Sequence, residues 1–355
     1  MGSMQTTALH CRAPQFWASA LTARLWPRCW ANPPMTSSGL PPTIWSNRMG
    51  RSSCLRMRSF TMRLRQPAEE PSRRAAPGAA DHYAALDPGL RAVHLDRAGD
   101  PQAARAYLEA ARREAAEYRY AAAQALGRRG LELASEREER FALASLLGEV
   151  LHDLGDMPAA LASCQEALNA AGSDAERCRA LLGVAAVKRV TDDIDGALAD
   201  LVAAEAIAET HGLTHELARL HLLRGNLYFP SGDIERCLRE HGRSLELAER
   251  TGSAELAAAA LGGLGDGEYM RGRMMSARDR FARCVKLCQD HGLVRIEVAH
   301  RPMLAFTSWF AGDGVKAAAE AALAIEMAQR VAHHRAEMIG RHAACFIGLC
   351  PYGRL

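Results

Sequence analysis

The stretch that decides the fold is residues 210–252, THGLTHELARLHLLRGNLYFPSGDIERCLREHGRSLELAERTG. Glycines stand at 212, 232 and 252, and the residues between them are mostly good helix formers. Glycine ends helices and forms tight turns because it enters the left-handed backbone region without steric cost. The stretch therefore predicts two helices of roughly 17 residues each, joined as a hairpin.

The same spacing continues along the chain. Turn residues follow at Gly272, Gly292 and Gly312, and precede at Asp192 and Gly172. First helices of successive hairpins are expected to begin near residues 174, 214, 253, 294 and 333, and second helices near 194, 234, 274 and 314. Upstream, the pattern predicts helices over 86–97, 101–116, 118–134, 136–154 and 157–171. Repetition of one hairpin makes an α-solenoid, so the predicted fold class is all-α.

Small side chains recur at three sites of this forty-residue unit. The sites hold Ala185, Gly225, Gly265 and Ala305; twelve residues on, Ala197, Cys237, Ala277 and Ala317; and seven further on, Ala204, Ser244, Cys284 and Ala324. Small residues at fixed positions let helix backbones approach closely. The spacing resembles that of tetratricopeptide (TPR) repeats, whose usual length is roughly 34 residues. We predict a TPR-like right-handed α-solenoid with repeats of roughly 40 residues, against the alternative of a generic helical bundle with coincidental alanines.

Residues 1–80 do not have the pattern of a domain. Residues 1–68 contain nine arginines and no acidic residue, and four of the five tryptophans lie there without a period. This composition predicts disorder, with a transit peptide or sequence not under folding selection as alternatives; residues 66–80 form a Pro/Ala linker. The solenoid is expected over 81–355. Its last helix, 333–350, has no partner before the end of the chain, which predicts truncation at the C-terminus and allows self-association through that helix.

The sequence lacks the motifs of catalysis and cofactor binding. Its three lysines, Lys188, Lys286 and Lys316, complete no phosphate-binding P-loop, and neither HExxH nor GxSxG occurs. The glycine-rich run 262–267 is similar to a phosphate-binding loop, but it falls in a first-helix slot, where close packing is favoured. We therefore expect no enzyme activity, no cofactor and no metal, with an enzyme in its own right as a third, weaker hypothesis.

Composition also limits the compartment and the partners. The ten cysteines form no CxxC pair, and most fall at helix positions that suit a small apolar residue, which indicates core roles and a cytoplasmic location. No run of eighteen apolar residues predicts a membrane span. The mildly acidic helical part gives no support to nucleic-acid binding. The remaining partner class is a protein or peptide.

A groove on the concave face is the candidate binding site. In such a stack the first helices are expected to line that face. The candidate groove residues follow the small first-helix site by one or four positions: Arg189, Asn226, Phe229, Asp266, Tyr269, Phe306 and Trp309. Aromatic side chains flanked by Asn and Asp are suited to holding a peptide or a partner helix. The alternative is that these side chains pack between neighbouring hairpins.

Three longer strings carry a family resemblance: HELARLHLLRGNLYFPSGDIERCLREH (215–241), GDGEYMRGRMMSARDRFARCVKLCQDHGL (265–293) and HHRAEMIGR (333–341). They resemble the C-terminal TPR-like region of bacterial signalling proteins in which a class III adenylate/guanylate cyclase domain precedes a STAND-type ATPase. The string HLDRAGDPQAARAYLEAARREAAEYRYAAAQAL (94–126) is similar to the segment that joins the ATPase to the repeats. The likeness implies a non-catalytic sensor or protein-interaction role in signal transduction, because the cyclase aspartates and Walker motifs have no counterpart here. The alternative is the repeat region of a LuxR/MalT-like transcription regulator.

Overall fold

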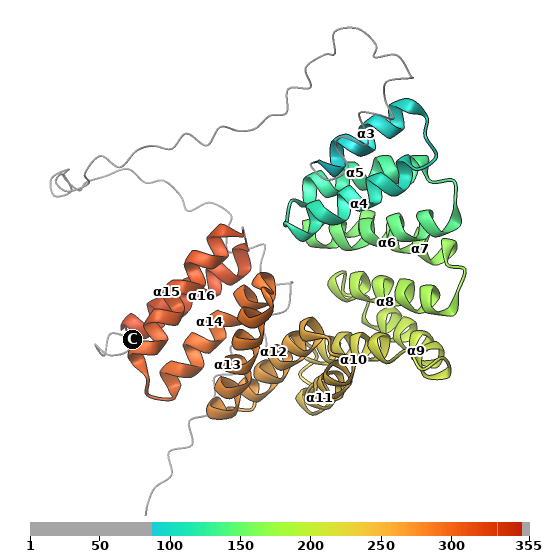
Figure 1. Cartoon of the computed structure of the whole chain (residues 1–355). Coiled ribbons are helices and arrows are strands. Elements are labelled where there is room, and N and C mark those ends of the chain that lie inside the picture. The colour runs from blue at the N-terminus through green and yellow to red at the C-terminus, as the bar shows by residue number, and fades with distance from the viewer. Residues whose placement is uncertain (1–86, 332, 350–355) are drawn as a thin grey trace, which may run out of the picture.

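The computed structural model describes residues 87–331 and 333–349, and within them the chain forms 14 helices and no strand (Figure 1). The helices are α3 (Pro88–Ala98), α4 (Ala103–Ala116), α5 (Tyr120–Leu133), α6 (Arg137–Leu154), α7 (Met157–Ala170), α8 (Asp174–Val190), α9 (Ile194–Thr210), α10 (Thr214–Tyr228), α11 (Ile234–Thr251), α12 (Ala254–Met270), α13 (Met274–His291), α14 (Val294–Phe310), α15 (Gly314–Arg330) and α16 (His334–Leu349). The predictions for residues 1–80 and for the last six residues lie outside the described part.

The predicted forty-residue hairpin is confirmed from α8 onward. First helices begin at residues 174, 214, 254, 294 and 334, and second helices at 194, 234, 274 and 314. The turn glycines at 212, 232, 252, 272, 292 and 312 all have positive φ, between 62° and 83°. Asp192, with φ of 66°, occupies the equivalent turn of the first hairpin. Among the described positions of these regular turns, Asp192 is the one that places a side chain in the sterically costly left-handed region.

An aspartate begins most of the second helices. The side chains of Asp156, Asp193, Asp233 and Asp313 each accept a hydrogen bond from the backbone N–H three residues on, at 3.0–3.2 Å. Such N-caps satisfy a backbone donor that would otherwise lack a partner at the helix start. At α13 the same position is Arg273, which makes no side-chain cap. The Gly-Asp pair is therefore the local signal that ends one helix and starts the next.

All twelve predicted small positions are buried, which confirms the packing role of the repeat. The two first-helix glycines receive large neighbouring rings. A Cβ placed on Gly225 would lie 2.7 Å from the His241 ring, and one on Gly265 would lie 2.6 Å from the Phe281 ring. Within the glycine-rich run, Gly262 and Gly263 likewise pack against the rings of His300 and His241. This run lies inside α12, so the expected close packing is confirmed.

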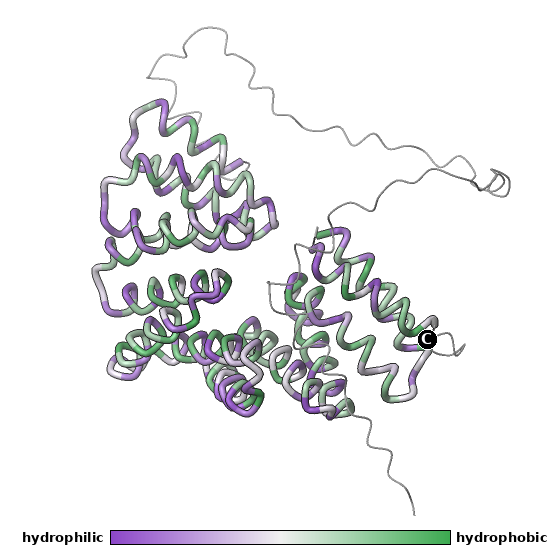
Figure 2. Tube along the Cα trace, turned by 180° about the vertical axis from the view of Figure 1, so that it is seen from behind, coloured by the Kyte–Doolittle hydropathy of each residue, from purple (hydrophilic) through white to green (hydrophobic). Residues whose placement is uncertain are grey.

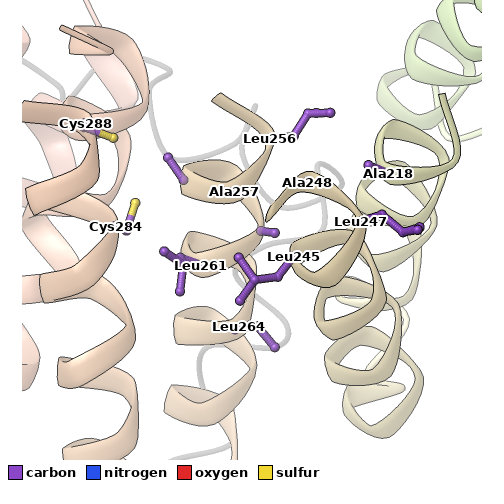
Figure 3. Close-up of a cluster of buried hydrophobic side chains, with 12 residues drawn as sticks. Ala218, Leu245, Leu247, Ala248, Leu256, Ala257, Leu261, Leu264, Cys284 and Cys288 are labelled. Carbon is purple, nitrogen blue, oxygen red and sulfur yellow. The ribbon is translucent and has the colours of Figure 1, made fainter. Parts of the chain in front are cut away.

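The apolar core is divided along the solenoid into a series of clusters between neighbouring helices. The cluster drawn in Figure 3 joins α10, α11, α12 and α13 through Ala218, Leu245, Leu261 and the thiols of Cys284 and Cys288. Figure 2 shows hydrophobic and hydrophilic residues interspersed along the helices. Each helix buries its apolar residues against its neighbours, which is how a repeat protein forms a continuous core. No helix in the described part is long and apolar enough to cross a membrane.

The contacts between successive hairpins show which way the stack curves. Successive first helices, from α6 through α8, α10, α12 and α14 to α16, each approach the next closely, whereas successive second helices in the described part do not. The first helices therefore form the inner wall and the second helices the outer wall of a curved body (Figure 1). The predicted placement of the first helices on the concave side follows from these contacts.

Candidate functional site

The seven predicted groove residues lie at or beside the C-terminal halves of the inner helices, but they differ in burial. Arg189, Asn226, Phe229 and Asp266 are partly exposed. Tyr269 and Trp309 are also partly exposed but pack against apolar clusters, and Phe306 is buried with 4% of its surface accessible. The residues therefore do not form one continuous aromatic ladder on the surface.

The aromatic residues at the C-terminal end form a ring cluster between α14 and α16. The ring of Phe346 lies 5.0 Å from that of Trp309 and 5.9 Å from that of Phe306, measured between centroids. Tyr269 packs against Phe281 and Leu304, between α12, α13 and α14. The alternative interpretation, packing between neighbouring hairpins, accounts for the burial of Phe306. The assignment of Arg189, Asn226, Phe229, Asp266, Tyr269 and Trp309 to a groove stays a prediction.

Charged groups gather where α8, α12, α14 and α16 face the inside of the curve. Burial lowers the pKa of Arg189, and the positive charge of Arg335 adds to this effect. The Nε atom of Arg189 is buried and has no hydrogen-bond partner among the described residues. Burial raises the pKa of Asp266 to about 7, opposed in part by Arg335. Near neutral pH the carboxyl group of Asp266 thus ionises only partly, and the charge of Arg335 acts on both Asp266 and Arg189.

Arg295 links the two ends of the curved body. From the first turn of α14 its guanidinium lies 5.0 Å from the ring centroid of Tyr120 and 5.9 Å from that of Tyr118, both at the α4–α5 junction. The same guanidinium lies 3.9 Å from a carboxylate oxygen of Asp153 on α6. Tyr118 has φ of 61°, an unusual conformation for a bulky residue. We name the group of Arg295, Tyr118, Tyr120 and Asp153 the clasp, because it brings α14 to α5 and α6 across more than 140 positions of sequence.

Sequence reasoning missed a cavity of about 350 Å³ between α6 and α8. Its lining includes Ser145 on α6, Arg179 on α8, Arg219 on α10 and Arg112 on α4. The sequence signal for it is that Arg179 and Arg219 are forty residues apart, so the repeat places them at equivalent positions of successive inner helices. The distances that bring α4 and α10 to one cavity are set by the curvature of the stack.

Two histidines of the central hairpins lie beside carboxylates on neighbouring helices. His211 Nε2 lies 3.0 Å from Asp174, and His221 Nδ1 lies 2.7 Å from Glu240. Within the described residues, no group of three or more His, Cys, Asp or Glu side chains is arranged to hold a metal ion. Cys164, Cys178, Cys237, Cys284 and Cys288 are buried, as expected for core roles, whereas Cys345 on α16 is exposed.

Comparison with known proteins identifies the fold. No family model matches the chain, and no curated protein sequence matches it. Among solved structures, a STAND protein with a tetratricopeptide repeat sensor from Pyrococcus horikoshii is similar over 80% of this chain, with a TM-score of 0.57 and 12% identity. This chain spans 44% of the length of that protein.

Two further solved structures are similar over most of their own length. A tetratricopeptide repeat protein from Parabacteroides merdae shares 12% identity with a TM-score of 0.53, over 76% of this chain and 98% of that one. A Rap protein complexed with competence and sporulation factor shares 13% identity with a TM-score of 0.52, over 79% and 88%. At these identities the likeness concerns architecture alone. The chain has the fold of a TPR-like α-solenoid.

Proposed function

We propose that this chain is a non-catalytic scaffold that binds a protein or peptide segment on its concave face. The observation that supports it most strongly is the curved stack itself, whose inner helices carry partly exposed polar and aromatic residues. Solenoids of this kind use their concave surface for binding extended partners. A peptide lying along α8, α10 and α12 would contact Arg189, Asn226, Phe229 and Asp266.

We further propose that the scaffold is the cytoplasmic sensor part of a cyclase–ATPase signalling protein. The strings over 215–241 and 265–293 support this proposal, as does the architectural likeness to a STAND protein with a repeat sensor. In such a protein the repeats would restrain the ATPase until a partner binds. Coding sequence for a cyclase or P-loop ATPase beside this chain in its genome supports the proposal. A helix-turn-helix domain there would favour a LuxR/MalT-like regulator instead.

The concave-face assignment is tested with a display selection of random peptides against the full chain. We expect wild-type protein to enrich peptides, and Asn226→Arg to abolish their binding because a long charged side chain would obstruct the groove. Val202→Arg is the matched control, since Val202 is 62% exposed on the outer helix α9. Equal loss of binding in both variants, or none in either, would remove the groove assignment. Nucleotide turnover by the purified chain would contradict the non-catalytic assignment.

A further inference from the structure

The lining of the cavity between α6 and α8 includes a residue in the same register as the proposed groove residues. Glu149, in its lining, follows Gly148 by one position, as Asn226 follows Gly225 and Asp266 follows Gly265. Gly148 is a first-helix small site, so Glu149 occupies the register of the predicted groove residues. The cavity therefore extends the groove toward α6, beyond the residues that the sequence indicated.

All three glutamates that line the cavity form ion pairs, but two of its three arginines do not. Glu149 lies 3.2 Å from Arg219, and the other two carboxylates of the lining, Glu138 and Glu176, both pair with Arg137, which is outside the cavity. Arg112 and Arg179 have no carboxylate within 4.0 Å among the described residues. These two guanidinium groups thus form no ion pair at one hollow in the surface, although Arg179 donates a hydrogen bond to the carbonyl of Ala175 and its charge lowers the pKa of Glu176.

Two further features equip the cavity for a short acidic side chain. The hydroxyl of Ser145 lines it, and this oxygen is buried with no hydrogen-bond partner among the described residues. A buried hydroxyl without a hydrogen-bond partner destabilises the protein, and an acceptor atom of a ligand would remove that cost by accepting its hydrogen bond. Phe141, Ala142 and Ala180 supply apolar walls, and the guanidinium of Arg179 lies 5.6 Å from the Phe141 ring centroid.

We propose that this cavity binds the carboxylate of a glutamate or aspartate side chain carried by the peptide that occupies the groove. Arg112 and Arg179 would pair with the carboxylate, Ser145 would donate a hydrogen bond, and the apolar walls would cover the methylene groups. The inference rests on the proposed function, because it names the chemistry of the partner at one end of that groove.

A single negative charge fits the lining better than a phosphate group. Glu138, Glu149 and Glu176 line the same cavity as the two unpaired arginines. These carboxylates would repel a doubly charged phosphate more strongly than a singly charged carboxylate. The cavity volume of about 350 Å³ accommodates one side chain with its backbone. These charges favour a carboxylate over a phosphorylated residue of the same peptide.

The experiment uses the full chain and the peptide most enriched in the display selection. That peptide is synthesised with Glu, Gln or phosphoserine at its acidic position, and the Kd of each form is measured by fluorescence polarisation. We expect the Glu form to bind wild-type protein at least tenfold more tightly than the Gln form. The double variant Arg112→Gln, Arg179→Gln is expected to abolish that preference. Arg177→Gln, on the exposed side of α8, is the control and should preserve it.

The outcomes separate this inference from the proposed function. Enriched peptides without an acidic residue, or a Glu preference that survives in the double variant, would overturn the carboxylate site and leave peptide binding intact. Tighter binding of the phosphoserine form would overturn the choice of carboxylate. Failure to enrich any peptide would overturn the proposed function, and this inference with it. Thermal melting verifies that all variants are folded.

Discussion

Single positions in the inner helices determine which neighbouring side chains fit between hairpins. Gly225 and Gly263 lie on two sides of His241, whose burial lowers its pKa to about 4. Gly265 receives Phe281, which is completely buried. At these sites the lack of a side chain on glycine leaves space that a ring from a neighbouring helix fills.

Replacement of Gly265 by Ala is expected to destabilise the protein by about 1–3 kcal/mol, because the new Cβ would overlap the Phe281 ring. Gly242→Ala is the matched control, since nothing lies within 4 Å of a Cβ at that position of α11. The control is expected to gain up to about 1 kcal/mol from higher helix propensity. Urea denaturation measures both. An equal effect at the two sites would contradict the packing argument.

Asp266 is expected to make stability depend on pH. Its folded-state pKa is about 7, against an ordinary value of 3.8, so the folded protein holds this proton more tightly than the unfolded chain does. The free energy of unfolding contributed by this group therefore falls as pH rises from about 4 to about 7.

We expect Asp266→Asn to be as stable as wild type at pH 4 and more stable at pH 8, by up to about 4 kcal/mol. The pH dependence of the difference isolates Asp266 from His241 and His300, whose lowered pKa values act in both proteins. Chemical denaturation at several pH values provides the measurement. A difference that does not change with pH would show that ionisation of Asp266 is not its cause.

At the scale of the element, the aspartate N-caps define where the second helices start. The sequence already contains the Gly-Asp pairs at 155–156, 232–233 and 312–313, and the exception at 272–273. The caps at α11 and α15 have donor–acceptor distances of 3.0 Å. Because these signals are local, the helix boundaries followed from sequence alone.

Arg273→Asp is expected to stabilise the protein by about 1 kcal/mol, because α13 would gain the cap that α11 and α15 have. The ion pair lost with Glu268 is at 3.7 Å and involves an arginine that is 62% exposed, so its loss costs little. Asp233→Ala, the converse change, is expected to cost about 1 kcal/mol. Thermal melts of both variants supply the comparison, and a destabilised Arg273→Asp protein would refute the cap argument.

For the whole molecule, the clasp joins α14 to α5 and α6, and we expect it to hold the curved stack closed. Its two cation–π contacts and its ion pair together contribute about 1–2 kcal/mol, which is comparable to the energy that separates open and closed forms of a flexible solenoid. A partner entering the concave side would act on this same equilibrium.

Arg295→Ala is expected to open the stack and raise the radius of gyration measured by small-angle X-ray scattering. Arg283→Ala is the control, because Arg283 also lies 3.9 Å from a carboxylate, that of Glu249, but joins only α13 and α11. The control should leave the radius of gyration unchanged. An unchanged value in Arg295→Ala would mean that helix packing alone sets the curvature.

The sequence by itself determined the all-α class, the forty-residue hairpin, its helix boundaries and the burial of its small residues. These features depend on interactions within one hairpin or between adjacent helices, which the spacing of Gly, Asp and Ala records directly. The family resemblance suggested a role as the sensor part of a signalling protein, and that role stays a proposal.

Only the tertiary structure decided which inner-helix residues are covered by neighbouring helices and which stay partly exposed. Phe306 and Asn226 occupy the same register, one position after a small site, yet Phe306 is covered by α16 and Asn226 remains partly exposed. The clasp and the arginine cavity likewise join residues from α4 to α14. Small rotations between successive hairpins add up over many repeats, and no local sequence signal encodes their sum.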